Sequence, residues 1–507
     1  MGCCSLLLPC LVSSGGGLVF GYELAVISGA LLQLREDFGL SCVQQEALVT
    51  ALLLGALLAS VVGGSLIDWQ GRRASILFSN GLTLAGTFLL LFTSYPALLL
   101  GRATVGFAMC ISSMSCCIFV SELVPPEQRG VLVSLYEVGI TVGILVAYAV
   151  NYMLADTGEG WKWMFGLAAV PTLLQLLCLW RLPSNTQSNC AHPNRLQQLE
   201  NQKRSKGYNY LSLFQTKDNM RTRTVIGLAL VLFQQFTGQP NVLLYASTIF
   251  YTLGFHSHTA AVLASIGLGL VKVLSTLLSM TLSDRVGRRP LLIGGCSVMA
   301  VSLIIIGLFS THSHIEKMTC VSKDVYNINS TNTPEPFVNE YVNQTARYSG
   351  IGPGVKPTNA PPLNAPNTNW VILLSLMAAV SSYAVGFGPM TWLLLSEIFP
   401  AEVRGRAFAF TNCFNWSAHV LVTSTFLNLI DAIGLPRVFL LYGATAAISA
   451  AILCKILPET KGKSLEDIDA ELRLQRFYQN EDCCGLRRNS APQYHMVNFK
   501  DTLELSV

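Results

Sequence analysis

The chain has 507 residues, of which 51% are hydrophobic and only 12% are charged. This composition is too apolar for an ordinary soluble protein. The net charge of +4 says little as a total, so the positions of the charges along the chain carry the information. We therefore expect a membrane protein rather than a soluble domain.

Twelve apolar runs, most of them about 20 residues or longer, are the candidate membrane spans. They cover residues 9–33, 47–67, 74–93, 97–120, 131–154, 161–180, 224–251, 259–283, 290–310, 369–395, 407–431 and 435–457. Lipid offers no hydrogen-bond partner to the backbone, so such runs form helices. A β-barrel would need alternating segments of about ten residues, and the sequence lacks them. The expected fold is all-α and transmembrane.

Two charged passages occur twice, which indicates an internal duplication. Asp-Trp-Gln-Gly-Arg-Arg at 68–73 returns as Asp-Arg-Val-Gly-Arg-Arg at 284–289, and Ser-Glu-Leu-Val-Pro-Pro-Glu-Gln-Arg-Gly at 121–130 returns as Ser-Glu-Ile-Phe-Pro-Ala-Glu-Val-Arg-Gly at 396–405. Duplicated halves in a membrane protein are typical of transporters, which move two bundles about a central site. We expect a six-helix bundle at 1–182, a linker at 183–222, a second six-helix bundle at 223–457 and a tail at 458–507.

Positive charges gather in the short links after even-numbered spans and in the linker 183–222. By the positive-inside rule these segments face the cytosol, and so do both termini. Because topology explains the charges, we expect no nucleic-acid partner.

The segment 311–368 is an insertion on the exofacial side, rich in Asn, Thr, Pro and Gly. Asn329 and Asn343 lie there in glycosylation sequons. Cys42 and Cys320 also map to exofacial loops, an oxidising compartment. We expect either a disulfide between these two cysteines or two free thiols.

Several motifs together carry a family resemblance. They are the paired Gly-Arg-Arg links, Phe-Gly-Tyr at 20–22, Gln-Gln at 234–235, Gly-Phe-Gly-Pro-Met-Thr-Trp at 386–392, Phe-Asn-Trp at 414–416 and Pro-Glu-Thr-Lys-Gly at 458–462. Each is weak alone, but in this order the chain resembles the sugar-porter family of the major facilitator superfamily, and within it the vertebrate facilitative glucose transporters. The resemblance covers nearly all of the transmembrane chain.

The resemblance implies substrate contacts at Gln234, Gln235, Trp392 and Asn415. Amides suit sugar hydroxyls because one amide both donates and accepts hydrogen bonds. Polar residues inside apolar spans are costly and usually functional. Trp392 offers a flat apolar face to a sugar ring, and the neighbouring Gly386 suggests a broken helix rather than an interfacial anchor.

Three departures from the family pattern alter the predicted site. Pro240 stands where relatives carry a binding asparagine, so Asn241 or Gln239 is the substitute. Glu137 and Lys272 stand where glucose uniporters carry a glutamine and an asparagine. We expect these two charges to form an intramembrane pair, either as part of the site or as a structural ion pair that narrows it. Removing one partner alone would strand a buried charge.

Glu23 and Arg102 occupy positions similar to an acid and an arginine that a proton-coupled bacterial member of the family uses. A movement that makes or breaks such a pair changes how tightly the acid holds its proton. The alternative is a locked structural pair.

Charged residues at the cytosolic helix ends predict a latch that joins the two bundles in one conformation, as in the family's outward-open state, or else they only anchor topology. The latch residues are Arg72, Arg73, Glu122, Arg129, Arg288, Arg289, Glu397 and Arg404.

The resemblance implies hexose uniport by alternating access, with glucose, galactose and dehydroascorbate as candidate cargoes. Proton–sugar symport and a non-transporting sugar sensor are the alternatives. An enzyme is not expected, because no Cys/His set has metal-ligand spacing and no glycine-rich phosphate loop follows a strand. We expect no cofactor and no metal, a small sugar and the lipid bilayer as partners, and residence in an endomembrane or perinuclear compartment rather than the plasma membrane. The sequence does not indicate an oligomeric state.

Overall fold

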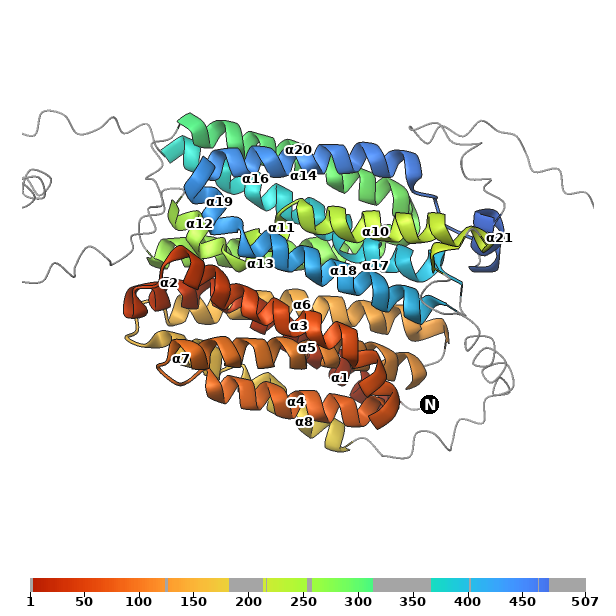
Figure 1. Cartoon of the computed structure of the whole chain (residues 1–507), viewed down its shortest axis with the longest axis horizontal. Helices are drawn as coiled ribbons and strands as arrows, with labels where there is room; N and C mark the ends of the chain where they lie inside the picture. Colours follow the sequence, from red (N-terminus) through yellow and green to blue (C-terminus); the bar gives the residue numbers. More distant parts are fainter. Residues whose placement is uncertain are drawn as a thin grey trace, which may run out of the picture.

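The computed structural model describes residues 3–123, 126–181, 213–215, 217–252, 258–312, 366–400, 403–463 and 465–473. Throughout these ranges the regular secondary structure is helical. The helices run roughly side by side and form two layers, one from each half of the chain (Figure 1). The all-α fold expected from the apolar runs is therefore confirmed for the described residues.

The first layer contains the helices of the first half of the chain. They are α1 (Cys3–Ala25), α2 (Ile27–Phe38), α3 (Cys42–Gln70), α4 (Arg72–Leu89), α5 (Tyr95–Leu123), α6 (Pro126–Met153), α7 (Gly160–Gly166) and α8 (Ala169–Arg181). Within this layer α1 packs against α6, and α5 packs against both α3 and α4.

The second layer repeats this arrangement with the second half of the chain. Its elements are a short 3₁₀ turn η2 (Lys217–Asn219), α10 (Met220–Phe236), α11 (Gln239–Leu244), α12 (Ala246–Thr252), α13 (His258–Val286), α14 (Arg288–His312), α16 (Pro366–Val385), α17 (Phe387–Ile398), α18 (Arg404–Ser424), α19 (Phe426–Ile433), α20 (Leu435–Ile456) and α21 (Leu465–Arg473). Here α14 packs against α16 and α20, and α10 packs against α18.

Two breaks inside the second half come from glycine. Gly238 separates α10 from α11 with a φ of 72°, and a side chain added there would collide with the Tyr442 ring. Only glycine adopts this backbone conformation at no steric cost. Gly386 separates α16 from α17 with φ −97° and ψ −89°, outside the helical region. The helix break that the glycines around Trp392 suggested is therefore present.

Nine segments of the described chain are long and apolar enough to cross a membrane. They are Leu11–Phe38, Cys42–Ile67, Tyr95–Cys116, Leu135–Met153, Gly160–Trp180, Ala260–Ser283, Arg288–Thr311, Trp370–Ile398 and Leu435–Ile456. The other three predicted spans coincide with α4, with α10 to α12 and with α18 to α19, which are helical but shorter or more polar. The count of twelve spans and the cytosolic termini stay predictions.

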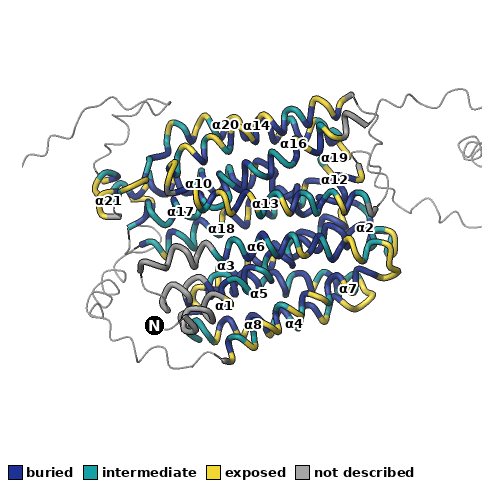
Figure 2. The backbone as a smooth tube through the Cα atoms, turned by 180° about the vertical axis from the view of Figure 1, so that it is seen from behind, coloured by how far each residue is buried: buried dark blue, intermediate teal, exposed yellow. Residues whose placement is uncertain are grey.

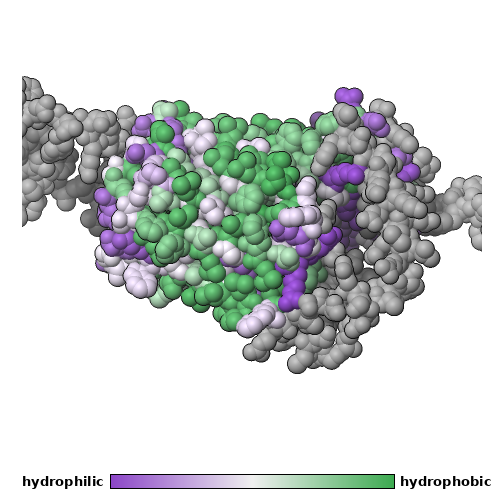
Figure 3. All heavy atoms as spheres, turned by 60° about the horizontal axis from the view of Figure 1, so that its bottom comes forward, coloured by the Kyte–Doolittle hydropathy of each residue, from purple (hydrophilic) through white to green (hydrophobic). Residues whose placement is uncertain are grey.

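The outer surface is apolar where a bilayer would contact it. Large side chains such as Leu58, Val61 and Leu274 are more than half exposed. Figure 3 shows apolar residues covering the middle of one face, with polar residues toward its ends. An exposed apolar belt of this kind is stable only in lipid, because water would have to solvate it.

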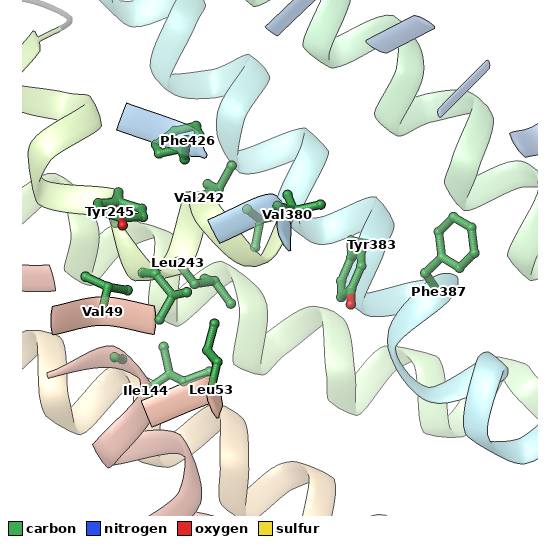
Figure 4. Close-up of a cluster of buried hydrophobic side chains, with 14 of the residues drawn as sticks. Val49, Leu53, Ile144, Val242, Leu243, Tyr245, Val380, Tyr383, Phe387 and Phe426 are labelled. Atoms are coloured by element: carbon green, nitrogen blue, oxygen red, sulfur yellow. The ribbon is translucent and has the colours of Figure 1, made fainter. Parts of the chain in front are cut away.

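The two layers share a buried core. α6 lies along α13, and α3 lies along α18. The residues where the two layers meet are largely buried (Figure 2). Val49, Leu53 and Ile144 of the first half lie close to Val242 and Leu243 of the second (Figure 4), all in one hydrophobic cluster. Burying apolar side chains from both layers holds the halves together.

Candidate functional site

Two of the predicted amides form a direct hydrogen bond in the second half. Gln235 Nε2 on α10 donates to Asn415 Oδ1 on α18 over 2.7 Å. Both residues are about 5% exposed, and Gln235 Oε1 is buried with no protein partner. A buried carbonyl oxygen without a donor costs free energy. It is therefore a ready acceptor for a hydroxyl group.

Gln234 is anchored at the break between α16 and α17. Its Nε2 donates to the backbone oxygen of Phe387 over 3.1 Å, and its Oε1 is buried without a hydrogen-bond partner. The break therefore satisfies one end of the amide and leaves the other end open. Gln234 and Gln235 each present one unpaired acceptor from the same turn of α10.

Trp392 lies on α17, one turn and a half beyond the break, and is half-buried. Its ring contacts the Phe408 ring, with centroids 5.4 Å apart and planes tilted by 40°. On α18, Trp416 stacks on His419 at 5.7 Å and also approaches Phe20 of α1. Aromatic rings therefore lie on α17 and on α18, the helix that carries Asn415.

The structure gives Asn241 a structural role instead of the predicted substrate contact. Its Nδ2 donates to the Val422 backbone oxygen at 3.0 Å and to the Tyr442 hydroxyl at 3.2 Å, and its Oδ1 accepts from Thr423 at 2.9 Å. Asn241 is fully buried, and the protein uses both N–H donors of its amide and one of its two acceptor positions. Gln239 differs, because its buried Nε2 has no protein acceptor.

Glu137 and Lys272 face each other on α6 and α13, which pack together across the two halves. Their charges interact electrostatically, but within the described chain no ion pair of 4.0 Å or less joins them. The Lys272 ammonium lies 5.5 Å from the centroid of the Tyr383 ring. The expected close ion pair is therefore absent from this conformation, and the two charges are held apart.

Glu23 and Arg102 do come together, on α1 and α5. Arg102 Nη1 lies 3.6 Å from the Glu23 carboxylate and donates to the Glu23 backbone oxygen at 3.0 Å. Both side chains are fully buried, and both Glu23 carboxylate oxygens lack a hydrogen-bond donor. Arg102 also lies over the Phe165 ring at 5.8 Å. A buried acid beside a single arginine is thus present where the sequence predicted one.

Most of the described hydrogen bonds between the halves lie at the ends predicted to be exofacial, and sequence reasoning missed them; Ser60 Oγ also contacts Cys413 Sγ at 3.4 Å farther along α3 and α18. Glu46 on α3 accepts from the backbone nitrogen of Asn428 at 2.9 Å and also from the Asn428 side chain. Ser28 Oγ contacts Ser247 Oγ at 3.1 Å, and the Tyr148 hydroxyl donates to the Leu243 backbone oxygen at 2.9 Å. The one available signal was an acid, Glu46, at the edge of an apolar run.

The described latch contacts lie within each half. Arg288 Nη2 pairs with Glu397 at 3.4 Å, Arg289 donates to the Cys454 backbone oxygen at 2.8 Å, and Arg73 donates to the Leu179 backbone oxygen at 2.9 Å. Arg404 donates to the Phe399 backbone oxygen. Arg72 lies at the first residue of α4. Glu122 and Arg129 lie on α5 and α6, but their side chains are outside the described part. A latch between the halves therefore stays a prediction.

Two contacts at the ends predicted to be cytosolic were also missed. The Glu459 carboxylate accepts from the backbone nitrogens of Arg288 and Arg289, both at 3.2 Å, and so caps the start of α14. Arg223 pairs with Asp469 of α21 at 2.7 Å. Both contacts join segments that are far apart in the chain, so a local sequence pattern does not predict them.

Most residues of the predicted exofacial modifications lie outside the described part of the chain. Asn329, Asn343 and Cys320 lie outside the described residues. Cys42 is disulfide-bonded, and its pairing with Cys320 stays a prediction. Among the described side chains, no three His, Cys, Asp or Glu residues gather as metal ligands would.

Comparisons with known proteins point in one direction. Residues 9–351 and 357–472 match the family described as "Sugar (and other) transporter". The chain is 50% identical to the Danio rerio solute carrier family 2, facilitated glucose transporter member 10, over 99% of this chain and 100% of that protein. Identity to the Homo sapiens member 12 is 38%, over 92% of this chain and 85% of that protein.

Solved structures of similar fold are sugar transporters as well. A crystal structure of a D-xylose-proton symporter superposes with a TM-score of 0.68 at 28% identity, covering 90% of this chain and 99% of that one. The inward-open conformation of the E. coli xylose transporter gives a TM-score of 0.67 at 27% identity, covering 91% of this chain and 98% of that one.

Proposed function

Because the chain belongs to the sugar transporter family, it carries sugar across a membrane, and we propose that its cargo is a hexose moved by uniport. D-glucose is the first candidate substrate, and galactose and dehydroascorbate are the others. The proposed mechanism is alternating access, in which the two six-helix halves rock about a site between them. No chemical step on the sugar is involved.

The observation that carries this proposal is the set of buried amides on α10 and α18. Gln234 and Gln235 each have a buried carbonyl oxygen without a protein donor, and Asn415 adjoins Gln235. A sugar hydroxyl buried without a partner costs about 1–3 kcal/mol. Unpaired amide oxygens therefore favour a ligand with several hydroxyls. Trp392 supplies an apolar face for the C–H side of the ring.

Most of the described hydrogen bonds between the halves lie at one end, which supports an inward-facing state. They lie at Glu46–Asn428, Ser28–Ser247 and Tyr148–Leu243, the ends predicted to be exofacial. With these contacts closed, a bound sugar exchanges with the opposite side of the membrane. Breaking them is then the step that reopens the site outward.

Uptake of radiolabelled glucose, galactose and dehydroascorbate into proteoliposomes tests the proposal. We expect equilibration of at least one of them without an ion gradient, and reduced uptake in Gln235→Ala. Gln215→Ala is the matched control, because the Gln215 side chain is exposed before α10 and away from the amide cluster. Failure of the wild-type protein to equilibrate any hexose would overturn the proposal.

Proton-coupled symport is the second candidate, favoured by the buried Glu23–Arg102 contact at 3.6 Å. An acid with no hydrogen-bond donor to its carboxylate is poised to take up a proton when its environment changes. An inward proton gradient should then accelerate and concentrate uptake, and Glu23→Gln should abolish that response. Unaltered uptake under the gradient would leave uniport as the mechanism.

We propose residence in an internal membrane, an expectation that rests on the family resemblance alone. Fractionation of cells expressing the tagged full-length chain tests it, and recovery with plasma-membrane markers would contradict it.

A further inference from the structure

Glu137 and Lys272 are ionisable side chains on the facing helices α6 and α13, and the uniport proposal gives them no part in a movement or in proton transfer. Glu137 is half-buried on α6, and Lys272 is 8% exposed on α13. The two helices come from opposite halves of the chain and pack against each other (Figure 1). The pair therefore spans the boundary at which a central site must lie.

The two charges are close but not joined. They influence each other electrostatically, yet no ion pair within 4.0 Å links them in the described chain. In the described chain no acceptor lies within hydrogen-bond distance of the Lys272 ammonium, which lies 5.5 Å from the centroid of the Tyr383 ring. A buried charge without a direct partner is costly, so a bridging polar group is favoured between them.

Tyr383 connects this pair to the amide cluster. It projects from α16 just before the break, next to Phe387, with ring centroids 6.3 Å apart (Figure 4). The Phe387 backbone oxygen accepts from Gln234 at 3.1 Å. The Tyr383 ring thus has the ammonium of Lys272 on one side, and its neighbour Phe387 holds Gln234. The charges and the unpaired amide oxygens belong to one polar region.

We propose that Glu137 and Lys272 together make this site select uncharged polyols and reject ionic sugars. This rests on the proposed hexose transport and names a determinant of its specificity. A carboxylate only accepts hydrogen bonds and an ammonium only donates them, whereas a hydroxyl does both. Sugar hydroxyls can therefore accept from the Lys272 ammonium and donate to the Glu137 carboxylate.

This arrangement gives neither an anionic nor a cationic sugar a net electrostatic gain. An anionic sugar is attracted by Lys272 but repelled by Glu137, and a cationic sugar meets the reverse. Because the two charges have opposite signs, their effects on an ionic ligand largely cancel, so nothing offsets the cost of removing that ligand's charge from water.

The test compares glucose with glucuronate, an anion, and with protonated glucosamine, a cation, as inhibitors of glucose uptake in proteoliposomes. In the wild-type protein both ions should inhibit at least about tenfold more weakly than unlabelled glucose, equivalent to about 1.4 kcal/mol. Equal inhibition by glucose and by either ion would overturn the proposal, and this arm needs no variant.

Single variants then separate the two charges. Glu137→Gln leaves Lys272 alone and should shift inhibition toward glucuronate by about tenfold or more relative to glucosamine. Lys272→Asn should shift it equally in the opposite direction. The double variant Glu137→Gln with Lys272→Asn removes both charges and should restore the wild-type ratio.

A merely structural ion pair gives a different pattern. Single variants would then lose uptake of every sugar, the ratio between the two ions measured by competition binding would stay at the wild-type value, and the proposal would be wrong. If the wild-type protein carries no hexose at all, the proposed function fails. If it carries hexose while the ion ratio stays fixed in both single variants, only this inference fails.

Discussion

The contact between Glu46 and Asn428 offers the sharpest mechanical test. Glu46 lies on α3 in the first half and is 2% exposed. Its carboxylate accepts from the backbone nitrogen of Asn428 at 2.9 Å and from the Asn428 side chain. Asn428 lies in the first turn of α19, where backbone N–H groups have no partner within the helix. One carboxylate therefore caps a helix of the opposite half and holds the two outer ends together.

Glu46→Gln perturbs this contact with little change in volume. It converts one acceptor oxygen into a donor that faces the donors of Asn428, so it removes one hydrogen bond to a charged group. Such a bond contributes about 1.5–3 kcal/mol. The equilibrium for opening the outer ends should then rise by about 10- to 150-fold.

Hydrogen exchange of the Asn428 backbone amide measures this opening equilibrium directly, because that amide donates the hydrogen bond to Glu46. In reconstituted protein we expect faster exchange across Phe426–Ile433 in Glu46→Gln by a factor in that range. Glu159→Gln is the control, since Glu159 lies just before α7 at the same end, with its side chain 64% exposed and paired to Lys162. An exposed pair contributes about 0–1 kcal/mol. Equal exchange of the 426–433 peptide in wild type and Glu46→Gln would refute the reasoning.

Three further predictions follow from single contacts. Gln235→Ala removes an unpaired acceptor and the partner of Asn415, and should raise the KM for hexose by about 5- to 150-fold, measured by initial rates of uptake. Asn241→Ala should lower the thermal unfolding temperature, because Thr423 and Tyr442 lose their hydrogen-bond partner. The KM of any remaining transport should stay unchanged. An altered KM at normal stability would indicate that Asn241 contacts the substrate. Glu459→Ala removes the cap of α14 and should cost about 1 kcal/mol of stability, seen as a lower unfolding temperature with unchanged hexose KM.

Much of the architecture could be predicted from the amino-acid sequence. Long apolar runs must be helices in lipid, since only helices satisfy their own backbone groups. The repeated Gly-Arg-Arg links showed that the chain is built from two similar halves. The glycines around Trp392 predicted a break, and the structure has it at Gly386. These features are local, because each depends on residues that are neighbours in the chain.

The family resemblance predicted residue types for the candidate site, but it did not predict how those residues pair. The family resemblance named Gln235 and Asn415, yet their hydrogen bond joins positions 180 residues apart. Asn241 was the expected substitute for a missing ligand, and three contacts from α18 and α20 turn it into a structural residue. Nothing beside Asn241 in the chain reveals those partners.

The amino-acid sequence by itself determined that this chain is a helical membrane protein with duplicated halves and amides in its spans. Hydropathy, helix length and repeated motifs decide those properties within a short window of residues. Only the tertiary structure decided that Glu23 meets Arg102, that Glu137 stays apart from Lys272, and that Glu46 caps a helix 382 residues away. The physical reason is that a buried polar group takes whichever partner helix packing brings to it, and that packing depends on the whole chain.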